Sequence, residues 1–279
     1  MKIKANAKIN LTLDICSKRS DGYHIIDSVM QSVSLFDELE LKRADNISIW
    51  YSDIGKCGED DICYKAAKSF FERANISGGA EIRIEKKIPC VAGVGGSSSD
   101  AAAVIVELNR MYGTDFSVDT LCEIGLKVGA DVPFCIVGGT VRVGGIGEKL
   151  EPIKAIPSCA FLIVVLSKKS STKQMYEEID SKPYDDAATP KMIDAIENRD
   201  LTEISKGLSN AFKAVHGIET EEKLLSEFAP LGIGLSGSGP AVYAVFENEE
   251  EALTAQSKLK KRQIISYVAI PREKGIEIE

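Results

Sequence analysis

Residues 89–103 decide which fold the sequence predicts, and they run Pro-Cys-Val-Ala-Gly-Val-Gly-Gly-Ser-Ser-Ser-Asp-Ala-Ala-Ala. A strand pattern at Ala80–Glu85 leads into this stretch, and a helix pattern leads out of it. Glycines let backbone N–H groups approach a phosphate closely, and a helix amino terminus adds unpaired donors and the positive end of a dipole. The alternative is a solvent-exposed connection with Ser99 or Asp100 as the helix cap, but the strand–loop–helix order favours a phosphate-binding loop.

Other nucleotide-binding motifs do not fit the sequence. The loop is not a Walker A motif, because no Gly-Lys-Ser or Gly-Lys-Thr follows at the required spacing. A formal G-x-G-x-x-G match at Gly232, Gly234 and Gly237 leads into a strand pattern at Ala241–Phe246 and not into a helix, so a dinucleotide fingerprint is excluded. The overlapping run Ser236-Gly-Ser-Gly-Pro240 is a candidate second wall of a phosphate site, although by itself it is better explained as a tight turn.

The amino terminus alternates strictly between apolar and polar side chains. The apolar positions are Ile3, Ala5, Ala7, Ile9, Leu11, Leu13 and Ile15, and the polar ones are Lys2, Lys4, Asn6, Lys8, Asn10, Thr12 and Asp14. A period of two predicts a strand with one face on a core, and it places Lys8 and Asn10 together on the opposite face, where a lysine is usually just solvated. Further along, Gly129-Ala-Asp-Val-Pro133 places Asp131 after a helix pattern, where an aspartate is usually a turn former.

Composition limits the class of protein. The chain has 279 residues, 44% of them hydrophobic and 27% charged, so a packed core is expected. Its net charge of −8 argues against sequence-independent nucleic-acid binding, which needs a basic face. No apolar run approaches the ~20 residues that span a bilayer, and no signal-peptide pattern is visible. Seven cysteines without a Cys-x-x-Cys pair favour reduced thiols over zinc or disulfides, so we expect a cytoplasmic protein without membrane or nucleic-acid partners. The sequence does not indicate the oligomeric state.

The pattern of elements predicts an α+β protein in two parts. Strands are expected at 3–15, 25–33, 38–42, 47–51 and 80–85 in the first half, and at 159–166, 241–246 and 265–270 in the second. Helices are expected from Ile62, after the glycine loop, from Ser117, in about three segments between 171 and 229, and at 249–260, with a hairpin at 138–147. Prolines bracket a weakly patterned segment at 150–157, so we expect domains at 1–153 and 154–279.

Several motifs occur together and in order, and they resemble a known superfamily. They are Lys8-Ile-Asn10, the 89–103 loop, Gly129-Ala-Asp-Val-Pro133 and Leu235-Ser-Gly-Ser-Gly-Pro240. The set resembles the galactokinase, homoserine kinase, mevalonate kinase and phosphomevalonate kinase (GHMP) superfamily. The chain looks most like one branch, the 4-diphosphocytidyl-2-C-methyl-D-erythritol kinases. The segments that carry this closer resemblance are Ala7-Lys-Ile-Asn-Leu11, Arg19-Ser-Asp-Gly-Tyr-His24, Gly129-Ala-Asp-Val-Pro-Phe134 and Ser171-Thr-Lys-Gln-Met-Tyr176. Arg19-Ser-Asp-Gly-Tyr-His24 is much more specific than the glycine loop. Val94 and Ser97 depart slightly from the family pattern, which often has leucine and glycine there.

The resemblance implies a fold and an activity. The fold would have a ribosomal protein S5-like amino-terminal domain and a ferredoxin-like carboxy-terminal domain. The activity would be transfer of a phosphoryl group from ATP, with Mg²⁺, to the 2-hydroxyl of 4-diphosphocytidyl-2-C-methyl-D-erythritol in non-mevalonate isoprenoid precursor synthesis. The partner would be a small molecule carrying a cytidine diphosphate group.

The resemblance also implies roles for individual residues. Asp131 would be the catalytic base, with Lys8 as its partner, because phosphoryl transfer needs positioning, charge neutralisation and a proton acceptor. The ATP phosphates would be held by Pro89, Cys90, Val91, Ala92, Gly93, Val94, Gly95, Gly96, Ser97, Ser98, Ser99, Gly237, Ser238 and Gly239. Ser99 would be a candidate magnesium ligand. The acceptor would be bound by Asn10, Tyr23, His24, Thr172 and Tyr176.

Three alternatives stay open at this point. One is another GHMP kinase of the homoserine or mevalonate type, although those acceptors carry no nucleobase for Tyr176 and the segment 19–24 to bind. The second is a catalytically silent sugar- or nucleotide-binding relative, although the chain retains both Lys8 and Asp131. The third is a non-enzymatic scaffold whose glycine segments are only turns, and a measurement of ATP binding with magnesium separates it from the other two. Tyr176 also has a purely structural alternative to acceptor binding, because it lies in a helix pattern and could belong to the core.

Overall fold

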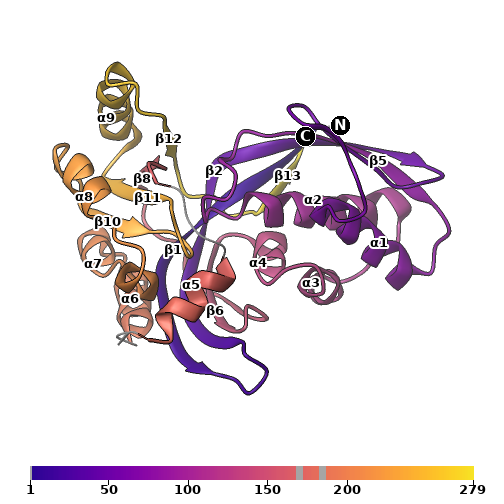
Figure 1. Cartoon of the computed structure of the whole chain (residues 1–279), viewed down its shortest axis with the longest axis horizontal. Helices are drawn as coiled ribbons and strands as arrows, with labels where there is room; N and C mark the ends of the chain where they lie inside the picture. The colour runs from indigo at the N-terminus through magenta and orange to yellow at the C-terminus, as the bar shows by residue number, and fades with distance from the viewer. Residues whose placement is uncertain (1, 168–171, 182–186) are drawn as a thin grey trace.

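A computed structural model describes residues 2–167, 172–181 and 187–279, and it arranges them as two β-sheets with helices packed against them (Figure 1). Within these ranges the larger sheet contains β1 (Ile3–Lys18), β2 (His24–Ala44), β3 (Ser48–Tyr51), β4 (Gly55–Cys57), β5 (Gly79–Glu85), β6 (Thr140–Gly145), β7 (Lys149–Pro152), β9 (Ser209–Asn210) and β13 (Ile276–Ile278). The smaller sheet contains β8 (Ala160–Val164), β10 (Gly232–Leu235), β11 (Val242–Phe246) and β12 (Ser266–Ala269).

Helices divide between the two sheets. The larger sheet is accompanied by α1 (Ile62–Ala74), α2 (Gly96–Tyr112), α3 (Val118–Leu126) and α4 (Val132–Val137), which gather on one side of it in Figure 1. The other lobe carries α5 (Thr172–Ile179), α6 (Ala188–Glu197), α7 (Leu201–Lys206), the 3-10 helix η1 (Ala211–Ala214), α8 (Glu219–Ser226) and α9 (Glu249–Lys261). The mixture confirms the expected α+β class.

The smaller sheet has a recognisable topology. Its order is β10-β11-β8-β12, and each neighbouring pair is antiparallel. Numbered along the chain, the strands therefore lie in the order 2-3-1-4, which is the order of a ferredoxin-like sheet. The expected strands at 159–166, 241–246 and 265–270 and the expected helix at 249–260 are confirmed as β8, β11, β12 and α9. Strand β10 was not expected, because its two glycines weaken the strand pattern.

Strand β1 contributes residues to each of the three hydrophobic clusters found among the described residues. Its apolar residues enter three hydrophobic clusters in succession, from Ile3 in the larger sheet to Ile15 among the helices of the other lobe. The strand was predicted correctly, but its polar face is not solvated as expected: Lys8, Asn10 and Asp14 are all at most 3% exposed. Residues from both halves of the chain cover this face, which a local sequence pattern does not show. Gly95 and Asp131 lie against Lys8. Gly237 and Thr189 donate hydrogen bonds to Asn10 and Asp14.

Two further expectations need correction. The strands expected at 25–33 and 38–42 form one continuous strand, β2, because a register shift opposite Asn6 and Ala7 lets the ladder continue. The hairpin expected at 138–147 is larger and joins β6 to β7. The division at 153/154 stays a prediction, and two short strands of the second half, β9 and β13, pair with β1 of the first.

Helix starts follow the local sequence. Asp61 caps α1 by accepting hydrogen bonds from the N–H groups of Cys63 and Tyr64, and Ser117 caps α3. Helix α2 differs, because its N-cap residue is Gly95, which has a left-handed backbone and provides no side-chain cap. The N–H groups of its first turn are therefore left for a ligand.

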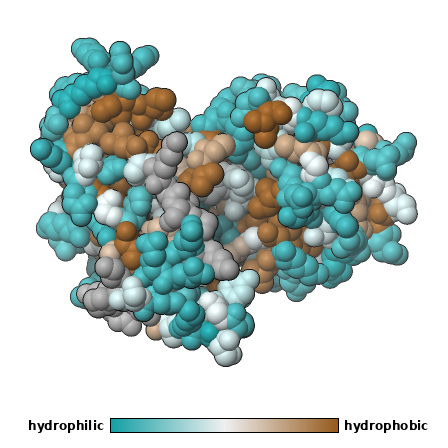
Figure 2. All heavy atoms as spheres, viewed as in Figure 1, coloured by the Kyte–Doolittle hydropathy of each residue, from teal (hydrophilic) through white to brown (hydrophobic). Residues whose placement is uncertain are grey.

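Hydrophilic side chains cover most of the face shown in Figure 2, and hydrophobic ones gather in a few patches, one of them beneath α9. In the described part of the chain, no helix is both long and apolar enough to cross a membrane.

Candidate active site

The glycine loop between β5 and α2 encloses a cavity of about 270 Å³, which is lined by Lys86 and residues 89–98. The backbone is left-handed at Val91, Gly93 and Gly95, with φ of 54°, 85° and 77°. Repeated left-handed residues turn successive N–H groups toward one side, and such concave backbone binds anions. The geometry at the start of α2 is therefore compatible with the binding of an anion.

The second glycine segment lies directly against this loop. The Ser236 hydroxyl donates to the Gly93 carbonyl at 2.9 Å, and the Ala241 N–H donates to the Ala92 carbonyl at 2.8 Å. A Cβ at Gly93 would lie only 2.4 Å from the Ser236 carbonyl oxygen, so the close approach requires glycine there. Ser238 and Gly239 belong to the same turn, and Gly239 has a φ of 76°. The structure thus brings both predicted walls together.

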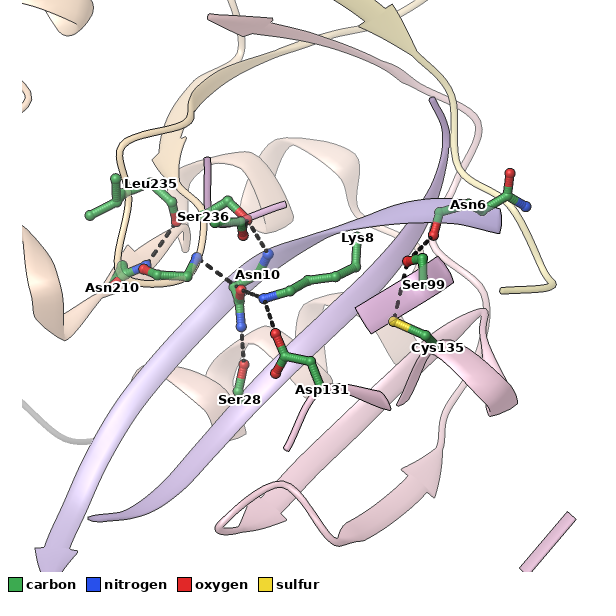
Figure 3. A network of polar contacts seen from close by, with 12 residues as sticks. Asn6, Lys8, Asn10, Ser28, Ser99, Asp131, Cys135, Asn210, Leu235 and Ser236 are labelled. Atoms are coloured by element: carbon green, nitrogen blue, oxygen red, sulfur yellow. Dashed lines mark hydrogen bonds and ion pairs between the residues drawn. The ribbon is translucent and has the colours of Figure 1, made fainter. Parts of the chain in front are cut away.

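Lys8 and Asp131 meet beside the glycine loop (Figure 3). Their Nζ and Oδ2 atoms are 3.2 Å apart; the lysine side chain is 3% exposed and the aspartate 35%. Strand β1 supplies Lys8, and Asp131 begins helix α4. The Lys8 N–H donates to the Val94 carbonyl at 2.9 Å, and a Cβ at Gly95 would lie 2.8 Å from Lys8 Cγ. The loop therefore rests on the stem of this lysine.

Asn10 is engaged within the protein on every side. Its Oδ1 atom accepts from Lys8 Nζ at 2.8 Å and from the Gly237 N–H at 2.9 Å, and its Nδ2 atom donates to the Ser28 hydroxyl at 2.9 Å. Its main-chain carbonyl accepts from the Tyr243 hydroxyl at 2.7 Å. The family resemblance implies that Asn10 contacts the acceptor, and in this structure its side chain links Lys8 to the second glycine segment.

The residues expected to hold the acceptor come from both halves. His24 stacks on Tyr176, with ring centroids 4.8 Å apart and an angle of 25° between the rings. Burial raises the pKa of Tyr176 to about 12, and the Asp131 carboxylate adds to this, so Tyr176 lies within electrostatic reach of the candidate base. Tyr23 does not join the stack and is 60% exposed. The side chain of Thr172 lies outside what the structure describes.

Asp180 fastens the His24 ring. Its Oδ1 atom is 2.7 Å from His24 Nε2, and its Oδ2 atom pairs with Lys18. Hydrogen bonds from these two partners hold the pKa of Asp180 below its usual value. The helix α5 that carries Tyr176 is therefore tied to the end of the β1–β2 hairpin.

A buried charge cluster beneath the glycine loop was missed by sequence reasoning. Lys86 Nζ pairs with Asp37 and, at 2.6 Å, with Asp100, and both carboxylates are fully buried. Asp37 also accepts from the N–H groups of Lys87 and Ile88 at 2.5 and 2.8 Å. The cluster thus holds both ends of the loop. No local signal marks it, because its members are separated by 49 and 14 positions in the chain.

Electrostatics within this cluster pull in opposite directions. Burial raises the pKa of Asp100 to about 8, although Lys86 opposes the effect. Burial alone would lower the pKa of Lys86, but the carboxylates of Asp100 and Asp37 outweigh it, so the pKa of this lysine is raised. Lys86 is therefore a fixed cation at the edge of the glycine-loop cavity.

Ser99 does not present its hydroxyl to the cavity. The side chain is fully buried, and its Oγ donates to the Asn6 carbonyl at 2.7 Å (Figure 3). Among the described residues, no group of three or more His, Cys, Asp and Glu side chains is arranged to hold a metal ion. The expected role of Ser99 as a magnesium ligand stays a prediction that this geometry does not favour.

Comparison with known proteins identifies the class to which this fold and site belong. Residues 61–139 match the family model described as "GHMP kinases N terminal domain", and residues 192–265 match "GHMP kinases C terminal". A solved crystal structure of a 4-(cytidine 5'-diphospho)-2C-methyl-D-erythritol kinase superposes with a TM-score of 0.77 at 26% identity, covering 97% of this chain and 99% of that one. The molecule is thus a GHMP kinase in fold, as the sequence motifs predicted.

Curated relatives narrow the assignment. A 4-diphosphocytidyl-2-C-methyl-D-erythritol kinase of Clostridioides difficile (strain 630) is 38% identical, with 100% of this chain and 97% of the relative covered. One from Caldicellulosiruptor saccharolyticus is 40% identical, with 93% of each covered. The chain belongs to the 4-diphosphocytidyl-2-C-methyl-D-erythritol kinase family. Its activity is that of an ATP-dependent small-molecule kinase.

Proposed function

We propose that the chain transfers the terminal phosphoryl group of ATP to the 2-hydroxyl of 4-diphosphocytidyl-2-C-methyl-D-erythritol, a step in non-mevalonate isoprenoid precursor synthesis. The observation that carries this proposal is the Lys8–Asp131 ion pair of 3.2 Å beside the glycine loop. Its relatives over the whole chain length bear this substrate in their names, which supports the choice of acceptor.

Asp131 and Lys8 have different roles at the reacting atoms: the aspartate accepts the proton, and the lysine stabilises charge. The acceptor oxygen forms a bond to the terminal phosphorus of ATP, the bond from that phosphorus to the ADP oxygen breaks, and the hydroxyl proton passes to the Asp131 carboxylate. Lys8 stays charged beside the Asp131 carboxylate and the reacting oxygen, and it stabilises negative charge on the phosphoryl group during transfer. The exposure of Asp131 suits a group that must meet a substrate, and the burial of Lys8 suits one that must not move.

The ATP phosphates would occupy the cavity of residues 89–98. The N–H groups at the start of α2 would hold them, and the segment 236–240 would close the site from the second half. Magnesium would be bound chiefly through ATP oxygens and water, because Mg²⁺ usually keeps several waters and needs few protein ligands. That fits a site whose described residues offer no acidic cage.

The cytidine end of the acceptor would lie near His24 and Tyr176, where the two halves of the chain meet. Cytosine has faces for aromatic stacking and an edge for hydrogen bonds. The exposed ring of Tyr23 would provide a further stacking surface once the acceptor is bound.

A direct test is coupled ADP release with ATP and magnesium over a panel of acceptors. The panel contains the cytidyl erythritol, homoserine and mevalonate. We expect turnover with the cytidyl acceptor alone. Turnover of homoserine or mevalonate with none of the cytidyl compound would refute the proposed acceptor, and ATP binding without turnover of any acceptor would point to a silent relative.

A further inference from the structure

Asn210 is a buried residue of strand β9, and no sequence motif marks it. Its Nδ2 atom donates to the carbonyls of Leu235 and Gly237 at 2.8 and 2.9 Å, and its Oδ1 atom accepts from the Phe212 N–H at 2.9 Å. Both amide hydrogens and the amide oxygen are therefore used. The side chain holds the second glycine segment from behind, on the side away from Lys8 (Figure 3).

A continuous chain of hydrogen bonds leads from this segment to the candidate catalytic pair. The Gly237 N–H donates to Asn10 Oδ1 at 2.9 Å, and the same oxygen accepts from Lys8 Nζ at 2.8 Å. Lys8 Nζ then lies 3.2 Å from Asp131 Oδ2. The network therefore runs without a gap from Asn210 to Asp131, through Gly237, Asn10 and Lys8.

We infer that Asn210 is a positioning residue for the reaction: by clamping the carbonyls of Leu235 and Gly237 it aims the Gly237 N–H at Asn10 and so fixes the ammonium of Lys8. The inference rests on the proposed roles of Lys8 and Asp131. Gly237 needs such a clamp because it has a φ of 56°, in a region that glycine enters and leaves easily. An amide oxygen accepts along two lone pairs, and loss of the Gly237 bond would leave the Asn10 amide held by Ser28 and Lys8 alone, so that it orients the ammonium of Lys8 less firmly.

The ATP loop has supports that do not pass through Asn210. The Ala241 N–H bonds the Ala92 carbonyl, and the Lys8 N–H bonds the Val94 carbonyl, at 2.8 and 2.9 Å. Loss of the clamp should therefore disturb the catalytic pair more than ATP binding. A small displacement of a reacting group is enough to lower the rate strongly.

Three variants and one control test the inference. Asn210→Asp keeps the shape and the oxygen that caps η1 but removes the donors, Asn210→Ser keeps a capping oxygen on a shorter side chain, and Asn210→Ala removes everything. The matched control is Asn248→Ala, which removes the amide cap of α9, where Asn248 Oδ1 accepts from the Glu251 N–H. Each protein is assayed for kcat, for the dissociation constants of ATP and acceptor, for Tm, and for hydrogen exchange of the Gly237 amide by NMR.

We expect kcat to fall roughly ten- to a hundredfold in Asn210→Asp, with ATP affinity within about threefold of wild type, and the Gly237 amide to exchange faster. The kcat of Asn210→Ser should lie between those of Asn210→Asp and the wild type. If Asn210→Asp does not fold, Asn210→Ser is the variant that tests the inference. Asn248→Ala should lower Tm and leave kcat unchanged. The inference is overturned if kcat of the folded variants stays within about twofold of wild type, or if both dissociation constants rise as much as kcat falls.

The same assay separates this inference from the proposed function. Rates are measured with whichever acceptor the wild-type chain phosphorylates, or as ATP hydrolysis if it phosphorylates none. Failure of the wild type on the cytidyl acceptor counts against the function alone, whereas unchanged Gly237 exchange in all three Asn210 variants counts against the clamp alone.

Discussion

Lys8 and Asp131 carry opposite charges in different surroundings, and the difference suits their proposed tasks. The lysine is buried and is held by Asn10 as well as by the aspartate, whereas about a third of the Asp131 side chain is exposed. A cation that is already oriented costs no reorganisation at the moment of reaction. A carboxylate at the edge of a cleft can still reach the hydroxyl of an incoming substrate.

Asp131→Asn should lower kcat by about 10²–10⁴-fold, because the amide keeps the shape but cannot accept the proton. The dissociation constants of ATP and acceptor should change little, which isothermal titration can measure. Asp119→Asn is the control, because Asp119 is an exposed acidic residue in the first turn of α3. This substitution should leave kcat unchanged. Near-wild-type kcat in Asp131→Asn would assign Asp131 to the structure of the turn.

Asp100 predicts a pH dependence of stability that can be isolated by mutation. Its pKa is raised to about 8 in the fold from an ordinary value of 3.8, so between these pH values the folded state holds a proton that the unfolded state has lost. The contribution of this group is therefore fully present below about pH 4 and declines as pH rises toward about 8. The free energy of unfolding of the wild type should fall relative to Asp100→Asn by up to about 1.4 kcal/mol per pH unit.

Urea unfolding at pH 6 and pH 8 tests this, because most other titrations are common to both proteins and cancel in the difference. Parallel curves for wild type and Asp100→Asn would show that Asp100 is ionised throughout, and that Lys86 compensates fully for its burial.

At the scale of elements, the decisive feature is the junction of β5, the glycine loop and α2. The loop is held by backbone bonds to Lys8 and Ala241, by Ser236, and by the cluster of Asp37, Lys86 and Asp100. The uncapped start of α2 supplies donors, and glycine supplies the left-handed turn that leads into it. Such a junction presents a fixed anion site before any nucleotide arrives.

Gly95→Ala and Gly113→Ala form a matched pair at the two ends of α2. Both glycines are left-handed, with φ of 77° and 63°, so both substitutions should cost about 1–2 kcal/mol of backbone strain. A Cβ at Gly95 would also meet Lys8 Cγ at 2.8 Å, whereas one at Gly113 meets nothing within 4 Å. Gly95→Ala should therefore weaken ATP binding and lower kcat, and Gly113→Ala should only lower Tm.

Binding of ATP followed by titration, together with kcat and Tm for both variants, checks this prediction. Equal losses of ATP affinity and kcat in Gly95→Ala and Gly113→Ala would mean that backbone strain in α2 causes them. Contact between the new Cβ and Lys8 would then not be the cause.

Local pattern was enough to predict elements whose signals lie within a few residues. The alternation of β1, the helices expected from Ile62 and from Ser117, and the strand–loop–helix order around Gly95 are of this kind. The motifs also predicted that two glycine segments belong to one site, and the contact of Ser236 with Gly93 agrees.

Features that depend on distant partners could not be predicted. Asn210 and Lys86 sit in unremarkable sequence, and their importance appears only when residues far along the chain meet them. The burial of the polar face of β1 could not be predicted for the same reason, because the residues that cover it, such as Asp131, Thr189 and Gly237, lie far along the chain. Strand β13 pairs with β1 across nearly the full length of the chain, where no local pattern carries information.

At the scale of the whole molecule, the proposed acceptor site lies where two halves of the chain meet. His24 begins β2 and Tyr176 lies in α5, and their rings stack with centroids 4.8 Å apart. The ring of Phe212 packs on the Tyr176 ring in a T-shaped arrangement, with centroids 4.9 Å apart. Asp180 and Lys18 fasten the same contact. The stack is thus both a joint between the halves and a candidate wall for the cytosine ring.

Tyr176→Ala should raise the Michaelis constant for the cytidyl acceptor about ten- to a hundredfold, since base stacking on an aromatic ring contributes ~1–3 kcal/mol. The constant for ATP should stay nearly unchanged, because the phosphate cavity is lined by Lys86 and residues 89–98 alone among the described residues. Tyr176→Phe keeps both ring contacts and should be mild, and Tyr23→Ala should raise the acceptor constant without lowering Tm, because that ring is exposed. A large loss of Tm in Tyr176→Ala with equal effects on ATP and acceptor would make Tyr176 a core residue that joins the halves and has no part in selecting the base.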